Sequence, residues 1–417
     1  MIVRRSAAVL ATTAVIGTAF APAALAADSS PSPSASQAIP SGLYGSTDPT
    51  YDGVWRQSLA LLAQDTVGVK PAAKAVDWLT GQQCASGAFA PYRADATAKC
   101  DAKTMVDTNN TAAAVQALAA LGGHDTETGK AVAWLKSVQN KDGGWGYVAG
   151  GASDANSTSV VIGALAAAGE KPADVSPGGK SPYDALATLA IACEGEGSGG
   201  GFAFQPDKKG KLAANADATA AAVLGSLGKG FVTTAGKTTT SGYACGATEK
   251  LTPAEAARGG ASYLSNALNG TPYLKSAMPG AKDQPDYGNT ADAVVALASD
   301  GWTKDAQKPL AWLEKNYGAW AAKAGPAAYA QLIFAAHATG TDPRDFGGAD
   351  LVKQLGATGP ATDAPDHSAV PGDEKKDEKK KKDDDKGLGV WWIVGVGLVA
   401  GIGIGFLISG RNKKQQL

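Results

Sequence analysis

The chain has 417 residues, and its 38 basic and 39 acidic side chains give a formal net charge of −1. A nearly neutral chain without a basic stripe lacks the electrostatic footprint of a nucleic-acid-binding protein, so we expect no nucleic acid partner. Only 3 histidines and 4 cysteines are present, and no C-x-x-C pair occurs among them. We therefore expect neither a metal nor a cofactor.

Residues 1–26 have the three parts of a secretory signal peptide. Arg4 and Arg5 give a basic start, residues 7–20 form an apolar core, and residues 24–26 supply the small-residue cleavage site. A first membrane helix is the alternative, but the apolar core is short for that role. Residues 27–50 are rich in serine and proline, so we expect them to be disordered.

Residues 107–147 contain one complete unit of two helices and a loop. The predicted first helix, 111–121, is small or apolar almost all round, as a helix buried on both sides should be. The second, 128–140, places apolar residues on a single face: Ala131, Trp134, Leu135 and Val138. A glycine-tryptophan loop over 142–146 then turns the chain back. This pairing predicts an inner and an outer layer of helices.

The unit recurs along the chain, and internal repeats outrank other sequence signals. The polar opening at 107–111 is echoed at 154–158, at 215–219 and, more weakly, at 287–292. The second helix recurs as well, because 74–79 and 130–135 share the pattern Lys-Ala-x-x-Trp-Leu. In these two copies Trp, Gln, Gly and a final aromatic residue have identical spacing: Trp78, Gln83, Gly87 and Phe89, then Trp134, Gln139, Gly143 and Trp145.

This pattern resembles the QW repeat of squalene cyclases and prenyltransferase β subunits, and the resemblance covers roughly residues 51–355. Those proteins are α/α toroids, a fold they share with cobalamin carriers of the transcobalamin and intrinsic factor type and with complement thioester domains. The copy at 130–146 is a specific match, whereas later copies are degraded. The resemblance implies that the repeat residues tie the outer helices together rather than bind a ligand: Trp78, Gln83, Trp134, Gln139 and Trp145.

Inner and outer helices are predicted to alternate. Inner helices should begin near Asp52, Asp107, Asp154, Asn215, Tyr287 and Gly325. Outer helices should occupy 71–83, 128–140, 181–192, 254–268, 305–316 and 346–355. These hairpins predict an all-α fold, a closed (α/α)6 barrel or toroid of six helical hairpins over residues 51–356, rather than an open solenoid. Closure buries the terminal repeats, so no polar capping repeat is needed.

The cysteines of this exported chain, Cys84, Cys100, Cys193 and Cys245, indicate disulfide bonds. Three pairings are possible. We favour Cys84–Cys100 together with Cys193–Cys245, because each bond would join the end of an outer helix to the long loop that follows. A zinc site is the alternative.

The C-terminal region changes character three times. Residues 357–386 become almost wholly charged and are predicted to form a flexible linker. Residues 387–410 are apolar and long enough to span a bilayer as a transmembrane helix. Residues 411–417 are basic, which places this tail in the cytoplasm and the toroid outside a single-pass membrane anchor. The expected partners are the lipid bilayer and, through the glycines of the apolar helix, a membrane transporter.

All inner helices of such a barrel run in the same direction, so their N-termini meet at one end and make it electropositive. N-capping needs one polar residue per helix, whereas this chain offers two or three. The surplus predicts a site for a polar ligand, with simple capping as the alternative for each residue. The candidate ligand-binding residues are Asp107, Asn109, Asn110, Asp154, Asn156, Asn215, Asp217, Tyr287 and Asn289.

The catalytic motifs of the resembled enzymes are absent from the barrel sequence. It contains no Asp-x-Asp-Asp stretch, no cysteine at an inner-helix start that could complete a prenyltransferase zinc site, and no Gly-Cys-Gly-Glu-Gln thioester. These absences favour a binding protein over an enzyme. A cell-surface glycoside hydrolase or polysaccharide lyase is the alternative, with Asp107 and either Asp154 or Asp217 as a carboxylate pair.

Val106-Asp107-Thr108 and the following alanine-rich helix resemble a stretch of the cobalamin carriers, which implies a corrinoid as the ligand. This sequence departs from the carriers at Asn109-Asn110, where they have small residues, and it has no counterpart of their β-rich second domain. We therefore expect a membrane-anchored, extracellular protein that binds a small molecule, with a corrinoid as one candidate. A scaffold that packs against membrane partners is the third possibility.

Overall fold

The computed structural model describes residues 39–192, 199–238, 251–277, 281 and 283–362. All of them belong to one compact unit, Ile39–Leu417. The described residues form thirteen α-helices and one short 3-10 helix, η1 (Pro172–Asp174). They also form a small antiparallel sheet of β1 (Leu274–Lys275) and β2 (Pro285–Asp286). The prediction of a mostly helical chain is confirmed.

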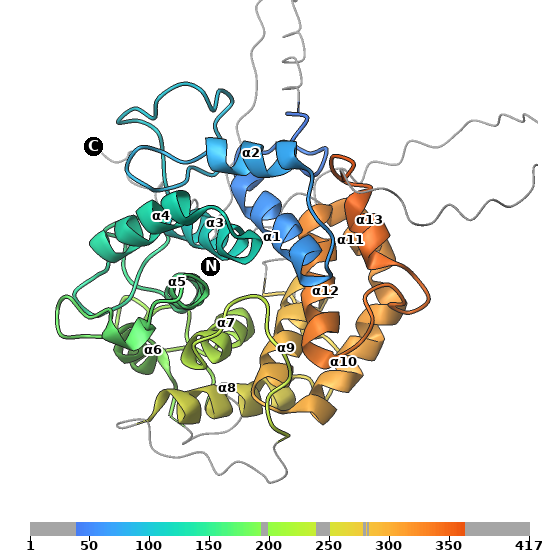
Figure 1. Cartoon of the computed structure of the whole chain (residues 1–417). Helices are drawn as coiled ribbons and strands as arrows, with labels where there is room; N and C mark the ends of the chain where they lie inside the picture. The colour runs from blue at the N-terminus through green and yellow to red at the C-terminus, as the bar shows by residue number, and fades with distance from the viewer. Residues whose placement is uncertain (1–38, 193–198, 239–250, 278–280, 282, 363–417) are drawn as a thin grey trace, which may run out of the picture. The chain divides into compact units, whose positions relative to one another are not determined.

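An inner layer of helices forms a closed ring (Figure 1). Each inner helix packs against the next one along the chain, and the last packs against the first, which closes the ring. In order, the inner helices are α1 (Gly53–Thr66), α3 (Thr108–Leu121), α5 (Ala155–Ala167), α7 (Ala216–Ser226), α9 (Tyr287–Ser299) and α12 (Pro326–Thr339).

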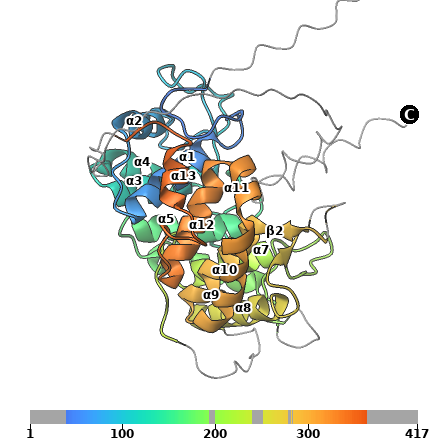
Figure 2. The same cartoon turned by 90° about the vertical axis from the view of Figure 1, so that its right-hand side faces the viewer.

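An outer layer covers the ring, with one outer helix packed against each inner helix. The outer helices are α2 (Ala73–Gly81), α4 (Asp125–Ser137), α6 (Pro182–Leu189), α8 (Pro253–Ala267), α10 (Thr303–Asn316) and α13 (Leu351–Gly356). Figure 2 shows the side of the ring on which a further short helix, α11 (Gly318–Ala324), lies beside α12. Helix α11 was not predicted from the sequence.

The two layers differ in burial as the residue patterns predict. The first eleven residues of α5, from Ala155 to Leu165, are all buried, because this helix contacts α3, α7 and α6. The outer helix α4 buries only Thr128, Ala131, Val132 and Leu135, which form one stripe. Burying a side chain such as Leu135 contributes about 2 kcal/mol to folding.

The repeat glutamines join the end of an outer helix to its own loop and to a later segment of the outer layer. The Gln83 side-chain amide donates to the carbonyl oxygens of Gly87, in its own loop, and Glu127, in α4, at 2.9 and 2.8 Å. Gln139 repeats this arrangement with the carbonyls of Gly143 and Val175, at 2.7 and 3.0 Å. A side chain at Gly143 would collide with the backbone of the next outer-helix start, so glycine is required there.

A threonine in the first turn of several inner helices holds the preceding loop. Thr158 Oγ1 accepts a hydrogen bond from the backbone N–H of Trp145 at 3.1 Å. The Trp145 indole, 1% exposed, donates in turn to the carbonyl of Leu135 at 2.7 Å. Equivalent bonds join Thr111 to Phe89, Thr219 to Phe202 and Thr290 to Leu274. The repeat aromatics are therefore fixed in the core between the layers.

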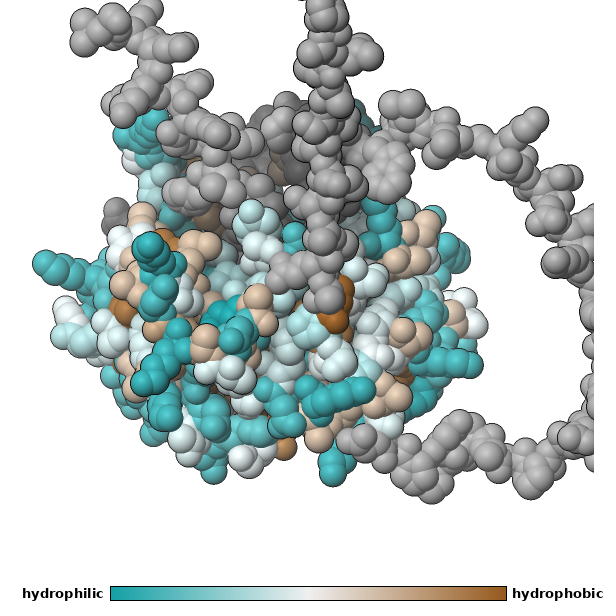
Figure 3. All heavy atoms as spheres, turned by 90° about the horizontal axis from the view of Figure 1, so that it is seen from above, coloured by the Kyte–Doolittle hydropathy of each residue, from teal (hydrophilic) through white to brown (hydrophobic). Residues whose placement is uncertain are grey.

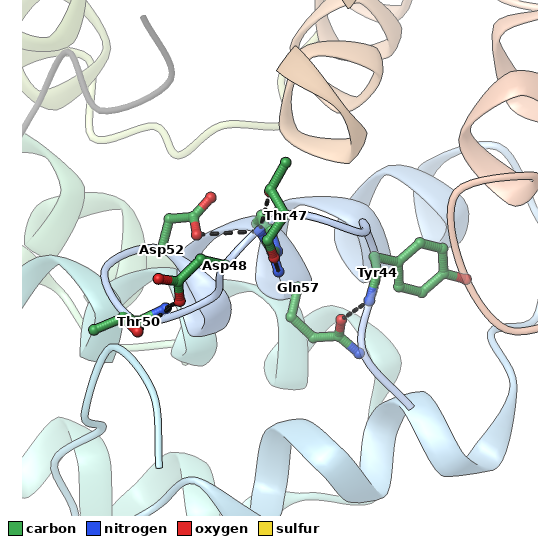
Figure 4. Close-up of polar contacts among 7 residues, drawn as sticks. Tyr44, Thr47, Asp48, Thr50, Asp52 and Gln57 are labelled. Atoms are coloured by element: carbon green, nitrogen blue, oxygen red, sulfur yellow. Dashed lines mark hydrogen bonds and ion pairs between the residues drawn. The ribbon is translucent and has the colours of Figure 1, made fainter. Parts of the chain in front are cut away.

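Residues 39–50 differ from the disorder predicted for 27–50. The Tyr44 side chain is fully buried, and its hydroxyl donates to Gln64 Oε1 at 2.9 Å. Its backbone N–H donates to Gln57 Oε1 at 2.8 Å (Figure 4). The next residue, Gly45, donates to the carbonyl of Thr358 at 2.8 Å. One aromatic anchor with buried polar partners orders this stretch, and composition does not reveal such an anchor.

Several predicted features can be compared with the structure only in part. The Cys84–Cys100 disulfide is present, with a Cα–Cα distance of 5.5 Å, as predicted. Cys193 and Cys245 lie outside the described residues, as do the predicted signal peptide and residues 363–417, which include the predicted membrane helix 387–410. Among the helices that are described, none combines the length and apolar character needed to cross a bilayer.

Candidate functional site

The residues that cap the inner helices build the helix starts. The side chains of Asp107, Asp154 and Asn215 accept hydrogen bonds from backbone N–H groups in the first turns of α3, α5 and α7. Those bonds measure 2.7, 2.6 and 2.8 Å. The second carboxylate oxygens of Asp107 and Asp154 accept from Asn110 Nδ2 and Ser157 Oγ, each at 2.8 Å. Three predicted ligand residues are thus structural caps.

Two more predicted residues belong to the start of α9. Asn289 donates from its side chain to Asp286 Oδ2 at 2.8 Å, and Asp286 caps this helix. The Tyr287 ring lies between Trp312 and Trp320, with ring centroids 4.8 and 5.4 Å away. These contacts are local to α9, α10 and α11.

The residues two positions after these caps behave differently. Asn109, Asn156 and Asp217 are each the second residue of an inner helix, in α3, α5 and α7. Asn156 Nδ2 donates to Asp217 Oδ2 at 2.7 Å, which joins two neighbouring inner helices. The side chain of Asn109 is 2% exposed, yet neither of its amide atoms has a partner among the described residues. Asn156 is also 2% exposed, and its Oδ1 atom is likewise unpartnered there.

Unpartnered buried amides are uncommon in folded proteins, because each unmade bond costs about 1–3 kcal/mol. The repeated register of these residues argues against an accident of packing. Asn109 and Asn156 therefore have free hydrogen-bonding capacity at the end of the ring where the inner helices begin.

Asp292 and Gln331 form a similar contact between the next two inner helices, where each is the sixth residue of its helix. Gln331 Nε2, from α12, donates to both carboxylate oxygens of Asp292, from α9, at 3.1 and 3.2 Å. We refer to Asn109, Asn156, Asp217, Asp292 and Gln331 as the inner belt. Gln331 was not predicted from the sequence, although a polar residue between apolar neighbours, Ala330 and Leu332, was a usable signal.

The two carboxyl groups of the inner belt hold protons unusually well. Burial raises the pKa of Asp217 to about 7, opposed by the hydrogen bond from Asn156 and reinforced by the charges of Asp286 and Asp154. Burial, then the charge of Asp217, raises the pKa of Asp292 to about 8, opposed by the bond from Gln331. Both side chains still reach solvent, as partly exposed residues. At neutral pH the pair therefore retains a proton.

An aromatic group lies about one helical turn from this pair. Gln331 and Phe334 are three residues apart on α12, so they share a face. Phe334 stacks on Phe231 at 6.4 Å, and Phe231 meets Trp55 edge to face at 5.5 Å. The backbone N–H of Phe231 donates to Gln116 Oε1 of α3 at 2.9 Å, which fixes the segment after α7 inside the ring.

The outer surface offers weaker candidates. A cavity of about 490 Å³ lies between the loops around Asn140, Gly150 and Pro206 and the end of α6, but no predicted ligand residue lines it. The face on the α2 side of the ring is mostly hydrophilic where the described residues are visible, with hydrophobic residues scattered among them (Figure 3). In the part of the chain that is described, no cluster of three or more acidic, histidine or cysteine side chains is placed to hold a metal ion.

Comparison with known protein families supports the toroid. Residues 54–224 match the family model of the prenyltransferase alpha-alpha toroid domain, which corresponds to the stretch from α1 into α7. No curated protein matches the chain. The closed ring of inner helices and the QW-like loops lie in and beyond the matched stretch. The chain therefore contains a prenyltransferase alpha-alpha toroid domain.

Proposed function

We propose that this chain is a membrane-anchored, extracellular binding protein whose toroid holds a small polar molecule at the end of the ring where the inner helices begin. The observation that carries the proposal is the unpartnered hydrogen-bonding capacity of the buried amides of Asn109 and Asn156. A ligand that bonds to them would recover the free energy that their burial costs.

The unpartnered atoms indicate the chemistry of the ligand. Oxygen acceptors predominate among the unpartnered atoms, namely Oδ1 of Asn109, Asn110 and Asn156. The carboxyls of Asp217 and Asp292 are further oxygen groups of the inner belt. A ligand that presents several N–H or O–H donors would complement them. A corrinoid such as cobalamin, with its peripheral amides, is the first ligand to test.

The anchor is part of the same proposal and is supported by sequence. The apolar run 387–410 and the basic residues after it are typical of a single-pass anchor with a cytoplasmic tail. The charged linker 357–386 would extend roughly 30 Å on average. The toroid would then work close to the membrane, where it could pass its ligand to a transporter.

Calorimetry with paired variants tests the site. Asn109→Ala and Asn156→Ala together should weaken corrinoid affinity roughly thirtyfold, at about 1 kcal/mol for each lost hydrogen bond. Asn109 is a better choice than Asn110, whose amide already donates to Asp107. Asn266→Ala, an exposed change on α8, is the matched control. Unchanged affinity in the double variant, with any ligand that binds, would remove the site from the inner belt.

A second function is favoured by one observation, the proton that Asp217 and Asp292 retain at neutral pH. A carboxylic acid next to a carboxylate can perform general acid and base catalysis, as glycoside hydrolases require. This pair replaces the pairing of Asp107 with either Asp154 or Asp217 that the sequence suggested, because Asp107 and Asp154 cap helices. Turnover of a cell-wall or capsule polysaccharide that Asp292→Asn abolishes would establish the enzyme.

A further inference from the structure

The acidic charge of the inner belt is uncompensated. The charged groups that act on Asp217 are Asp154, from the start of α5, and Asp286, from the start of α9. Those that act on Asp292 are Asp217 and Asp286. No lysine or arginine among the described residues contributes to either carboxyl. Clustered like charges in a poorly hydrated setting are unfavourable unless a cation joins them.

A buried amide is directed at the same place. Asn156 is 2% exposed, and its Nδ2 atom bonds to Asp217 Oδ2 at 2.7 Å. Its Oδ1 atom has no partner among the described residues. The side chain thus adds a free oxygen acceptor next to the acidic pair. A carboxyl and an amide oxygen can both bind a cationic N–H group or a C–H group next to a cationic nitrogen.

The aromatic rings distinguish an organic cation from a metal ion. Phe334 lies about one turn of α12 from Gln331, which contacts Asp292. Phe231 stacks on Phe334, and Trp55 meets Phe231 edge to face; Phe231 and Trp55 are both partly buried. A metal ion would gain nothing from these rings and would need more oxygen ligands than two carboxyls. An ammonium group gains from both, because aromatic faces attract cations by about 0.5–2 kcal/mol.

We propose that the molecule held at this site is an organic cation, with an amine or quaternary ammonium group between the carboxyls of Asp217 and Asp292 and the rings of Trp55 and Phe231. The inference rests on the proposed binding function and adds the charge of the ligand. The carboxyls bind the positive charge of the ligand. Asn156 accepts a hydrogen bond from a group of the ligand next to that charge, and the rings cover the apolar substituents of the ligand.

The test uses the full chain in detergent micelles and isothermal titration calorimetry at pH 8. The probes are choline and benzyltrimethylammonium, each paired with its uncharged isostere, in which carbon replaces nitrogen. Each cation should bind at least about tenfold more tightly than its isostere. The double variant Asp217→Asn with Asp292→Asn should lose that preference, and Phe231→Leu should reduce it severalfold. Asp125→Asn, an exposed change on α4, is the matched control.

Thermal melting of each variant separates binding from folding, since removing two like charges should not lower the melting temperature. Equal binding of a cation and its isostere, or a preference that survives in the double variant, would overturn the inference. A corrinoid that binds through Asn109 and Asn156 while both cations fail would overturn the inference but leave the proposed function standing. Cation binding that depends on the carboxyls but not on those amides would do the reverse.

Discussion

Replacing Asp292 with asparagine should stabilise the fold at neutral and alkaline pH while weakening the binding of a cation. The carboxyl has an ordinary pKa of 3.8 when unfolded, and burial beside Asp217 raises the folded pKa to about 8. Between these values the folded chain keeps a proton that the unfolded chain has lost. The stability of the wild type should therefore be highest below pH 4 with respect to this group and should fall as pH rises toward 8.

The size of the effect follows from the difference between the two pKa values. A shift of this size has an upper limit of about 5–6 kcal/mol at 1.36 kcal/mol per pH unit. The Asp292 side chain reaches solvent and accepts from Gln331, both of which reduce the penalty, so we expect a gain of about 2–3 kcal/mol for Asp292→Asn at pH 8.5. The gain should be small near pH 4 and should vanish at pH values well below 3.8, where the wild-type carboxyl is protonated in both the folded and the unfolded state.

Urea unfolding from pH 4 to pH 9, followed by circular dichroism, measures this gain. Asp125→Asn on the exposed side of α4 is the matched control and should not reproduce it. A gain that is the same at pH 4 and pH 8.5, or a loss of stability at pH 8.5, would show that folding does not disfavour the ionised form of Asp292.

Three further predictions concern the scaffold. Trp145→Ala should cost about 3–5 kcal/mol of unfolding free energy in urea titrations, because Trp145 is 1% exposed and its indole donates to the carbonyl of Leu135. A loss below about 1 kcal/mol would contradict the position of Trp145 in the core. Cys84→Ser should cost about 3 kcal/mol by opening the disulfide loop, and reducing agent should destabilise the wild type more than the variant. Deleting residues 303–356 removes α10 to α13 and should abolish cooperative melting of the whole domain, because α12 closes the ring on α1. Survival of a cooperative transition would indicate an open array of repeats.

Local signals account for the parts of the fold that the sequence predicted well. The predicted inner-helix starts at Asp107, Asp154 and Asn215 are the observed N-caps, because a capping side chain, its partner and the following threonine lie within five residues. Helix α11 and the packing of residues 39–50 were missed. Both depend on contacts with distant parts of the chain, such as the bond from Gly45 to Thr358.

The sequence predicted polar residues at the inner-helix starts as a group, but it did not separate their individual roles. A polar opening such as 154–158 contains a cap, Asp154, and a residue that contacts a neighbouring helix, Asn156. A shift of one or two positions along the helix exchanges these roles. Sequence alone could not decide that Asp107 caps α3 while Asn109 keeps unpartnered amide atoms. The pairing of Asp292 with Gln331 depends on the packing of α9 against α12, which no local pattern encodes.

The most direct test of the central claim is a crystal structure of the protein as purified from the cells that make it, without added ligand. Electron density for a small molecule in contact with Asn109, Asn156 and Asp217 is the expected result, since these groups have acceptors to offer. Density for ordered water alone at these side chains would contradict the account. So would a ligand seated only in the outer cavity beside Asn140.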